Sequence, residues 1–171
     1  MDLSKLTAGG KNVPEEVNAF VEISQGSSTK YELDKETGTL KVDRFLHTSM
    51  FFPFNYGFIP TTQGEDGDPL DILVLTTYPV TPGSVLVVRP VGMLEMEDES
   101  GNDTKILSVP VEKVDPSYRN VKDIKDVDPL ELDRIKHFFD HYKDLEPGKW
   151  VKTKNFLGKD KAYEAIKKAL K

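Results

Sequence analysis

The order of the hydrophobic patterns along the chain constrains its fold more than any other feature. Apolar side chains alternate with their neighbours at Ala19, Val21 and Ile23, and again at Tyr31 and Leu33. A period of two residues is typical of β-strands. Further strands are predicted over residues 39–43, 72–75, 85–96 and 105–114. Helical periodicity follows these segments, so the sequence predicts an α+β, mainly β protein with a closed antiparallel sheet.

Two helices are predicted near the C-terminus. Asp128 is a suitable N-cap for the longer one, and Pro129 stands at its first helical position. The apolar stripe of this helix continues until Pro147-Gly148 and comprises Leu132, Ile135, Phe138 or Phe139, Tyr142 and Leu145. A shorter helix is predicted from about Asp160 to Leu170. The stretch 51–60, rich in aromatic residues and proline, predicts a packed irregular segment.

The length and charge of the chain limit its organisation and its partners. Residues 1–171 are expected to form a single domain. The formal charge of −6 argues against non-specific nucleic-acid binding. Cysteine is absent, which excludes disulfides and thiolate metal sites and is consistent with the cytoplasm. The segment Met1 to Lys5 lacks an apolar signal core, and no run of about 18 apolar residues predicts a membrane span.

The stretch Asp66-Gly67-Asp68-Pro69-Leu70-Asp71 places three carboxylates within six residues. Its three aspartates precede a short apolar run, Ile72 to Leu75, that predicts a strand buried on both faces. Mg²⁺ prefers oxygen ligands, and neighbouring carboxylates repel one another unless a cation lies among them. Taken alone, however, such a stretch is more often an acidic turn, because Asp, Gly and Pro dominate turns.

A second acidic segment, residues 97–103, strengthens the prediction of a metal site. Asp98 and Asp103 lie in a loop between two predicted strands, and Lys105 follows directly. A curled sheet could bring this loop to the same mouth as the first one, where the two could hold more than one ion. Alone, this segment too is typical of a polar turn. Neither segment is an EF-hand, because its spacing places Asp71 or Asp103 where glycine is required.

Zinc catalysis is a further alternative that the histidines raise. His137 and His141 are four residues apart and face the same way on the longer predicted helix. The glutamate that follows the first histidine in a metalloprotease helix is missing, and no third histidine is close in sequence. A role at the surface or at a subunit interface suits the pair better, and His47 is most simply structural.

Side chains that could bind phosphate are dispersed along the chain. Alone, each is more typical of an exposed charge or a packed aromatic ring. They could bind one phosphate ligand jointly only if the fold brings them together. These candidates are Lys30, Arg44, Tyr56, Lys105, Tyr142 and Lys143.

In combination, these residues resemble the soluble family I inorganic pyrophosphatases, most closely the bacterial kind. The family signature is Asp, a small or polar residue, Asp, Pro or Glu, an aliphatic residue, and Asp, which residues 66–71 fit at every position. One departure is Phe52, where relatives often carry Tyr. Further matches lie at Pro14-Glu15, Val21-Glu22-Ile23, Lys30-Tyr31-Glu32, Val42-Asp43-Arg44, Asn55-Tyr56-Gly57, Arg89-Pro90-Val91-Gly92 and from His137-Phe138-Phe139 to Lys152.

The resemblance implies a five-stranded OB-like barrel with two flanking helices and an active site at its mouth. It also implies Mg²⁺-dependent hydrolysis of pyrophosphate to orthophosphate by a metal-activated water, with several ions per site, in a homohexamer. By this resemblance Asp66, Asp71 and Asp103 bind the first ion, and Asp71 also binds the second. Asp98, with Asp103, helps to hold ions that arrive with the substrate.

The resemblance assigns the remaining site residues as well. Asp68 corresponds to the general base for the attacking water. The implied phosphate contacts are Lys30, Arg44, Tyr56, Tyr142 and Lys143. Three further residues line the implied site with less defined roles, namely Glu22, Glu32 and Lys105.

Two other classes of function compete with a pyrophosphatase. A metal-binding module without catalysis explains both acidic segments but not the Lys, Arg and Tyr candidates. An OB-type nucleic-acid-binding protein fits the strand pattern, but the net charge opposes it, and Phe51, Phe52 and Phe54 lie among prolines rather than among basic residues. A phosphate-release assay distinguishes all three.

Overall fold

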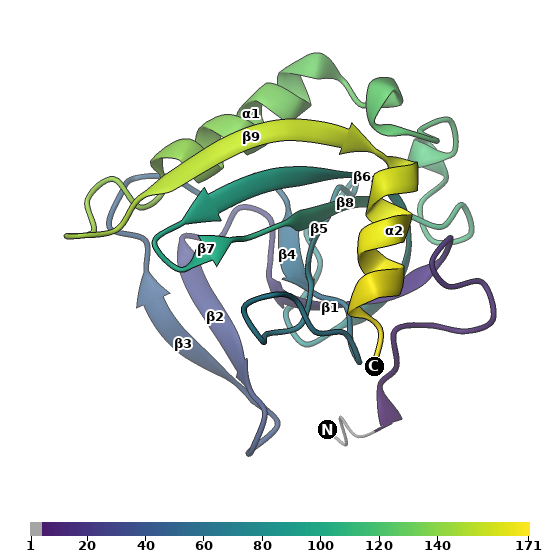
Figure 1. The fold of residues 1–171 in the computed structure, drawn as a ribbon, viewed down its shortest axis with the longest axis horizontal. Coiled ribbons are helices and arrows are strands. Elements are labelled where there is room, and N and C mark those ends of the chain that lie inside the picture. The colour runs from purple at the N-terminus through teal and green to yellow at the C-terminus, as the bar shows by residue number, and fades with distance from the viewer. Residues whose placement is uncertain (1–4) are drawn as a thin grey trace.

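The computed structural model describes residues 5–171 (Figure 1). Residues 1–4, which make up most of the segment expected to lack a signal core, lie outside the described residues. A seven-stranded sheet contains β1 (Val17–Ile23), β4 (Asn55–Phe58), β5 (Asp71–Val74), β6 (Val85–Asp98), β7 (Gly101–Asn102), β8 (Lys105–Pro110) and β9 (Val151–Gly158). A separate hairpin comprises β2 (Thr29–Asp34) and β3 (Thr39–Phe45) and projects from the large sheet as an arm (Figure 1).

Five strands of the large sheet are joined into a ring. β1 pairs with β4, β4 with β5, β5 with β8, β8 with β6, and β6 pairs again with β1. The predicted mainly β, α+β architecture is confirmed. The prediction of an entirely antiparallel sheet is wrong at β5 and β8, which run parallel with Asp71 opposite Lys105. A long connection, here containing β6 and β7, allows such parallel pairing, whereas a hairpin does not.

Several element boundaries differ from those predicted. β4 lies within the stretch 51–60 that was expected to be irregular, and β9 has no predicted counterpart. The last paired residue of β8 is Pro110 rather than Val114. Proline lacks the N–H group that would continue the ladder. Strands β1, β2, β3, β5, β6 and β8 otherwise occupy the predicted parts of the chain.

Strand β6 serves as the common partner of β1, β8 and β9. Its pairing register shifts between Pro90 and Gly92 opposite β8, and between Leu94 and Met96 opposite β9. Such β-bulges bend a strand and increase its twist. The bends allow one 14-residue strand to contribute to the ring and also to carry β9 along its outer part.

Both predicted helices are present. In α1 (Pro129–His141), the Asp128 side chain accepts a hydrogen bond from Leu130 N–H at 2.8 Å, which confirms the predicted cap. This helix ends at His141, before the predicted Pro147-Gly148, and lies beside β9 (Figure 1). The second helix is α2 (Lys159–Ala169), which packs on β6 and β9. Within residues 5–171, no helix has both the length and the apolar character needed to cross a membrane.

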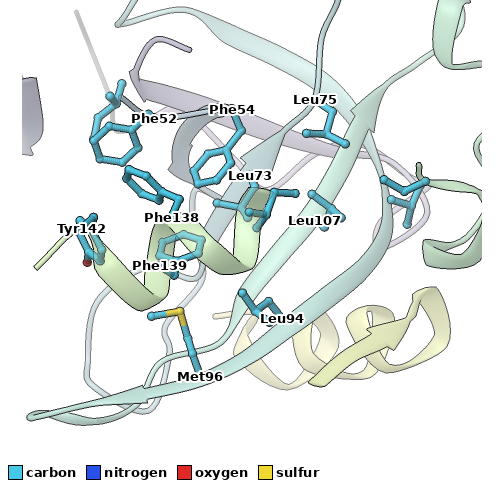
Figure 2. Close-up of a cluster of buried hydrophobic side chains, with 14 of the residues drawn as sticks. Phe52, Phe54, Leu73, Leu75, Leu94, Met96, Leu107, Phe138, Phe139 and Tyr142 are labelled. Atoms are coloured by element: carbon cyan, nitrogen blue, oxygen red, sulfur yellow. The ribbon is translucent and has the colours of Figure 1, made fainter. Parts of the chain in front are cut away.

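An aromatic cluster fills the space between α1 and the sheet (Figure 2). Phe138 and Phe139 of α1 contact Phe54, with ring centroids 5.5 and 5.4 Å apart. Phe138 also stacks on Tyr142, the residue that caps the end of α1. This packing orients the C-terminal end of α1, where Tyr142 and Lys143 follow one another.

Gly57 allows β1 and β4 to approach closely. A side-chain carbon placed on Gly57 would lie 1.8 Å from the carbonyl oxygen of Phe20, which no real contact permits. The close approach locks β4 against β1 and thereby fixes the neighbouring residue, Tyr56. Asn55, on the other side of Tyr56, is fully buried and donates from Nδ2 to Thr76 Oγ1 at 2.8 Å.

Candidate active site

A cavity of ≈ 680 Å³ opens between the β2–β3 hairpin, the loop before β5, the β6–β8 connection and the end of α1. Every residue for which the sequence predicted a role in the site lines this cavity. These residues are Glu22, Lys30, Glu32, Arg44, Tyr56, Asp66, Asp68, Asp71, Asp98, Asp103, Lys105, Tyr142 and Lys143. The fold therefore brings the dispersed candidates together, while their individual roles stay predictions.

Lys105 lies in the wall of the cavity between two carboxylates. Its Nζ is 2.5 Å from Asp71 Oδ2 and 2.6 Å from Asp103 Oδ1, and it donates to Tyr56 Oη at 3.1 Å. The side chain is only 4% exposed. Burial disfavours its charged form, but the adjacent carboxylates, Asp71 foremost, raise the pKa of Lys105 well above its usual value. The parallel register of β5 and β8, which the sequence did not predict, places Lys105 beside Asp71.

Asp66 and Asp68 lie in a tight turn that faces the cavity. Asp66 Oδ1 accepts a hydrogen bond from Asp68 N–H at 3.0 Å, and Gly67 adopts φ of 91°, a value that favours glycine. The Asp68 side chain is 74% exposed, with Oδ1 3.0 Å from Lys35 Nζ. Exposed ion pairs of this kind contribute about 0–1 kcal/mol. Asp68 can therefore exchange this partner for another at little cost.

Asp98 and Lys143 form the opposite wall. Lys143 Nζ lies 2.9 Å from Asp98 Oδ2 and 3.7 Å from Glu99 Oε1, and Lys149 Nζ lies 2.6 Å from the same Glu99 oxygen. The side chains of Asp98 and Lys143 are almost fully buried. This network fixes the end of α1 to the turn that follows β6.

Lys30 and Arg44 come from facing positions of the β2–β3 hairpin. Lys30 forms an ion pair with Glu32, and its Nζ also lies 3.2 Å from Asp43 Oδ2. Arg44 Nη1 is 2.5 Å from the same Asp43 oxygen. Both cations are thus restrained by carboxylates at the edge of the cavity.

Glu22 is the buried acid of the site. It is buried in β1, and its Oε1 accepts a hydrogen bond from Leu33 N–H at 2.8 Å. Burial is the main cause that raises the pKa of Glu22 to about 7, while the hydrogen bond from Leu33 opposes the shift. Burial likewise raises the pKa of Asp103, which the nearby Lys105 opposes.

The two tyrosines present protonated hydroxyl groups to the cavity. Burial raises the pKa of Tyr56 well above 10.0, and Asp71 adds to the shift. Burial raises the pKa of Tyr142 as well. Phenols that keep their proton can donate hydrogen bonds to phosphate oxygens.

The charges around the cavity favour metal ions together with a phosphate ligand. Of the described residues that line it, ten carry carboxylates and six carry cationic side chains. A polyanion binds to such a surface only if further positive charge arrives, and oxygen donors are the ligands of hard divalent ions. Within residues 5–171, no three carboxylates or imidazoles already lie close enough to enclose an ion. The donor set fits Mg²⁺ in its chemistry, and Lys105 supplies part of the compensating charge between Asp71 and Asp103.

Other charged residues at or near this cavity were not predicted from the sequence. Lys35, Glu36, Glu99 and Lys149 line it, and Glu146 pairs with Arg44 from behind. Their positions in a hairpin tip and in turns carry no pattern that distinguishes them from ordinary surface charges. Glu99 alone had a signal, because it belongs to the acidic segment 97–103.

His137 and His141 lie on the exposed side of α1 and do not line the cavity. Their ring centroids are 4.5 Å apart, and His141 Nδ1 lies 2.9 Å from Asp144 Oδ2. The predicted pairing of the two rings on one helix face is confirmed. Their predicted role at a surface or an interface stays a prediction.

Comparison with known proteins identifies the family to which the chain belongs. Residues 19–171 match the model of the family described as inorganic pyrophosphatase. The chain belongs to the inorganic pyrophosphatase family. Accordingly, it is an enzyme that hydrolyses inorganic pyrophosphate, and the predicted resemblance is confirmed.

Named relatives resemble the chain over most of its length. The inorganic pyrophosphatase of Aquifex pyrophilus is 57% identical over 161 residues, covering 94% of this chain and 91% of the relative. That of Gluconobacter oxydans is 52% identical over 170 residues, covering 99% of this chain and 98% of the relative. Both proteins are therefore similar to this chain over more than nine-tenths of its length.

Solved structures agree with the family assignment. The crystal structure of inorganic pyrophosphatase from Thermus thermophilus has a TM-score of 0.95 at 45% identity, covering 99% of this chain and 97% of that one. The Helicobacter pylori enzyme has a TM-score of 0.93 at 49% identity, covering 97% and 96%. The ring of strands and the flanking helices of this pyrophosphatase are thus features of the family fold.

Proposed function

We propose that this pyrophosphatase carries out Mg²⁺-dependent hydrolysis in the ≈ 680 Å³ cavity, with the residue roles that the sequence predicted. The observation that supports this most strongly is the convergence of carboxylates, cations and phenols from six separate parts of the chain onto one cavity. A metal-binding module without catalysis has no need of the phenols and cations opposite the carboxylates. Hydrolysis of a polyanion uses all three groups.

Asp66, Asp71, Asp98 and Asp103 are the proposed Mg²⁺ ligands. Their oxygen donors line one cavity, and two of them already share the charge of Lys105. Bound Mg²⁺ would neutralise charge on the phosphates and lower the pKa of coordinated water. Asp71 and Asp103, which both contact Lys105, would supply oxygen donors to Mg²⁺ beside this cation.

Asp68 is the proposed general base. Its exposed carboxylate can accept a proton from the water that attacks one phosphorus atom of pyrophosphate. The bond from that phosphorus to the bridging oxygen then breaks, and two orthophosphates form. Before this step, Asp68 exchanges its contact with Lys35 for the water.

Five residues are the proposed phosphate contacts. Lys30, Arg44 and Lys143 supply positive charge, while the protonated hydroxyl groups of Tyr56 and Tyr142 supply hydrogen bonds. Charge on the leaving phosphate is greatest as the bridging bond breaks, so fixed cations stabilise this state more than the ground state. Glu22 and Glu32 support the β2–β3 hairpin through Leu33 N–H and Lys30, respectively.

The remaining features are proposed on the family resemblance. The strand pairings support a closed five-stranded, OB-like barrel within one domain spanning residues 1–171. A homohexamer in the cytoplasm is proposed, with His137 and His141 at a contact between subunits. No binding of nucleic acid is proposed, because the formal charge is −6.

An Mg²⁺ titration tests the metal assignment. We expect Asp71→Ala to require a higher Mg²⁺ concentration for half-maximal phosphate release and to lose at least about tenfold in turnover, because an oxygen donor is removed. Glu164→Gln, which changes an exposed carboxylate on α2, is the matched control. A Mg²⁺ activation curve for Asp71→Ala that coincides with that of the wild type would show the assignment to be wrong.

A further inference from the structure

We propose that Glu146 is a positioning residue for the Arg44 guanidinium and thereby a determinant of pyrophosphate affinity. Arg44 lines the cavity, whereas Glu146 contacts Arg44 but is not among the residues that line it. This inference rests on the proposed role of Arg44 as a phosphate contact. It adds a residue that does not touch the substrate.

The contact between the two side chains is close and buried. Arg44 Nε lies 3.0 Å from Glu146 Oε1. The Glu146 side chain is 8% exposed and that of Arg44 is 26% exposed. A carboxylate is rarely buried to this extent unless it is paired, and Arg44 is the only cation within 4.0 Å of Glu146 among residues 5–171.

Glu146 belongs to the turn that follows α1. Its N–H donates to Lys143 O at 2.9 Å, and its own carbonyl oxygen accepts from Lys149 N–H at 3.2 Å. The same turn carries Lys143, which is paired with Asp98. The end of α1 is therefore fixed to the β6 turn by Lys143 and to strand β3 by Glu146.

Two carboxylates hold the guanidinium from different sides. Asp43 Oδ2 contacts Arg44 Nη1 at 2.5 Å, and Glu146 contacts Nε. Asp43 also contacts Lys30 and so divides its charge between two cations. Glu146 has no second cationic partner among the described residues, and its charge acts on Arg44 alone.

The pair is held by charge without full hydrogen bonding. Neither Arg44 Nε nor Glu146 Oε2 has a hydrogen-bond partner within residues 5–171, although both atoms are buried. Buried polar atoms without partners are uncommon in proteins, and each calls for an explanation. Here, the Glu146 carboxylate orients the guanidinium by its charge, while Arg44 Nη1 donates a hydrogen bond to Asp43 Oδ2.

A double-mutant cycle tests this role. We expect Glu146→Gln to raise KM for pyrophosphate about tenfold while changing kcat less than about twofold, because a charge-assisted contact that orients a binding group is lost. Arg44→Ala should raise KM at least as much. In the Arg44→Ala background, Glu146→Gln should then change KM by less than about twofold, because it has no guanidinium left to orient.

Control variants separate this role from a structural one. Glu146→Asp, which keeps the charge, should have a lower KM than Glu146→Gln, and the exposed Glu164→Gln should behave as wild type. Thermal unfolding followed by circular dichroism shows that each variant is folded during the assay. If Glu146→Gln fails to fold, the comparison of Glu146→Asp in both Arg44 backgrounds replaces it.

Three results would overturn the inference. If the fold-increases in KM caused by Glu146→Gln and Arg44→Ala multiply in the double variant, Glu146 does not act through Arg44. The proposed function would be unaffected by that result. A lower unfolding temperature with an unchanged KM would assign Glu146 a purely structural role. An unchanged KM for Arg44→Ala would instead remove Arg44 from the phosphate contacts, and the inference would fall with that part of the proposed function.

Discussion

The apolar interior and the wall of the cavity are both buried, but they are stabilised in different ways. In the interior, aromatic and aliphatic side chains pack without needing any particular partner. In the cavity wall, buried charges have specific ionic partners, as Lys105 has in Asp71 and Asp103. The difference shows why the wall is suited to ligands, since carboxylates outnumber cations there until a ligand brings more positive charge.

The two regions share their supporting elements. Helix α1 contributes Phe138 and Phe139 to the aromatic cluster (Figure 2). Tyr142 and Lys143, which directly follow the helix, line the cavity. The interior therefore acts as the rigid base that positions the charged groups. Changes in the two regions should consequently have separable effects on stability and catalysis.

Removal of the central cation should have the largest effect on stability. We expect Lys105→Met to lower the free energy of unfolding by about 3–5 kcal/mol in chelator, because Asp71 and Asp103 lose their shared counter-charge. Added Mg²⁺ should restore part of this loss. Urea unfolding with and without Mg²⁺ measures both effects, and Lys161→Met, at an exposed pair on α2, serves as the control. An equal loss with and without Mg²⁺ would contradict the proposal that Asp71 and Asp103 are Mg²⁺ ligands.

A substitution that leaves an unfilled space in the apolar interior should affect stability but not catalysis. Ile166 of α2 is fully buried and lies away from the cavity lining. We expect Ile166→Ala to lower the free energy of unfolding by about 2–5 kcal/mol through lost burial and an unfilled volume. The kcat of the folded variant should equal that of the wild type. A large fall in kcat well below the unfolding temperature would show that the two regions are not separable.

Titration of Glu22 should have a smaller effect on the free energy of unfolding, and this effect should depend on pH. Its pKa is raised from 4.5 to about 7 in the folded protein, so the folded state binds the proton more tightly than the unfolded state. The protonated Glu22 carboxyl therefore contributes to the stability of the folded state below about pH 4.5, and this contribution is lost as the pH rises through about 7. In the presence of a metal chelator, we expect the free energy of unfolding of the wild type to fall by roughly 2–3 kcal/mol across this pH interval relative to that of Glu22→Gln. The glutamine has no titrating proton at this position. If the free energies of urea unfolding of the wild type and Glu22→Gln change with pH in the same way, the raised pKa of Glu22 is ruled out.

Local patterns in the sequence predicted much of the fold. Asp128 and Pro129 marked the start of α1, because capping depends on residues that are adjacent in sequence. Strand β9 was missed because Lys152, Lys154 and Asn155 interrupt its apolar pattern, and its pairing with β6 is long-range. The parallel pairing of β5 and β8 likewise depends on the path of the chain rather than on local residues.

The candidate site was predictable in composition but not in arrangement. Residues 66–71 were, on local evidence alone, more typical of a turn, and Asp66 and Asp68 do lie in one. The resemblance to a family, rather than local pattern, separated their predicted roles. Lys35 and Glu146 were missed because their partners, Asp68 and Arg44, are distant in sequence.

Phosphate release from pyrophosphate by Asp68→Asn tests the central claim most directly. Asp68 is 74% exposed and contributes nothing to the interior, so the variant should fold as the wild type does. We expect turnover at saturating Mg²⁺ to fall by about 10²–10⁴, because a neutral amide cannot accept the proton of the attacking water. Circular dichroism and thermal unfolding should be unchanged. Turnover near that of the wild type would contradict the assignment of Asp68 as the base and the chemistry proposed for this cavity.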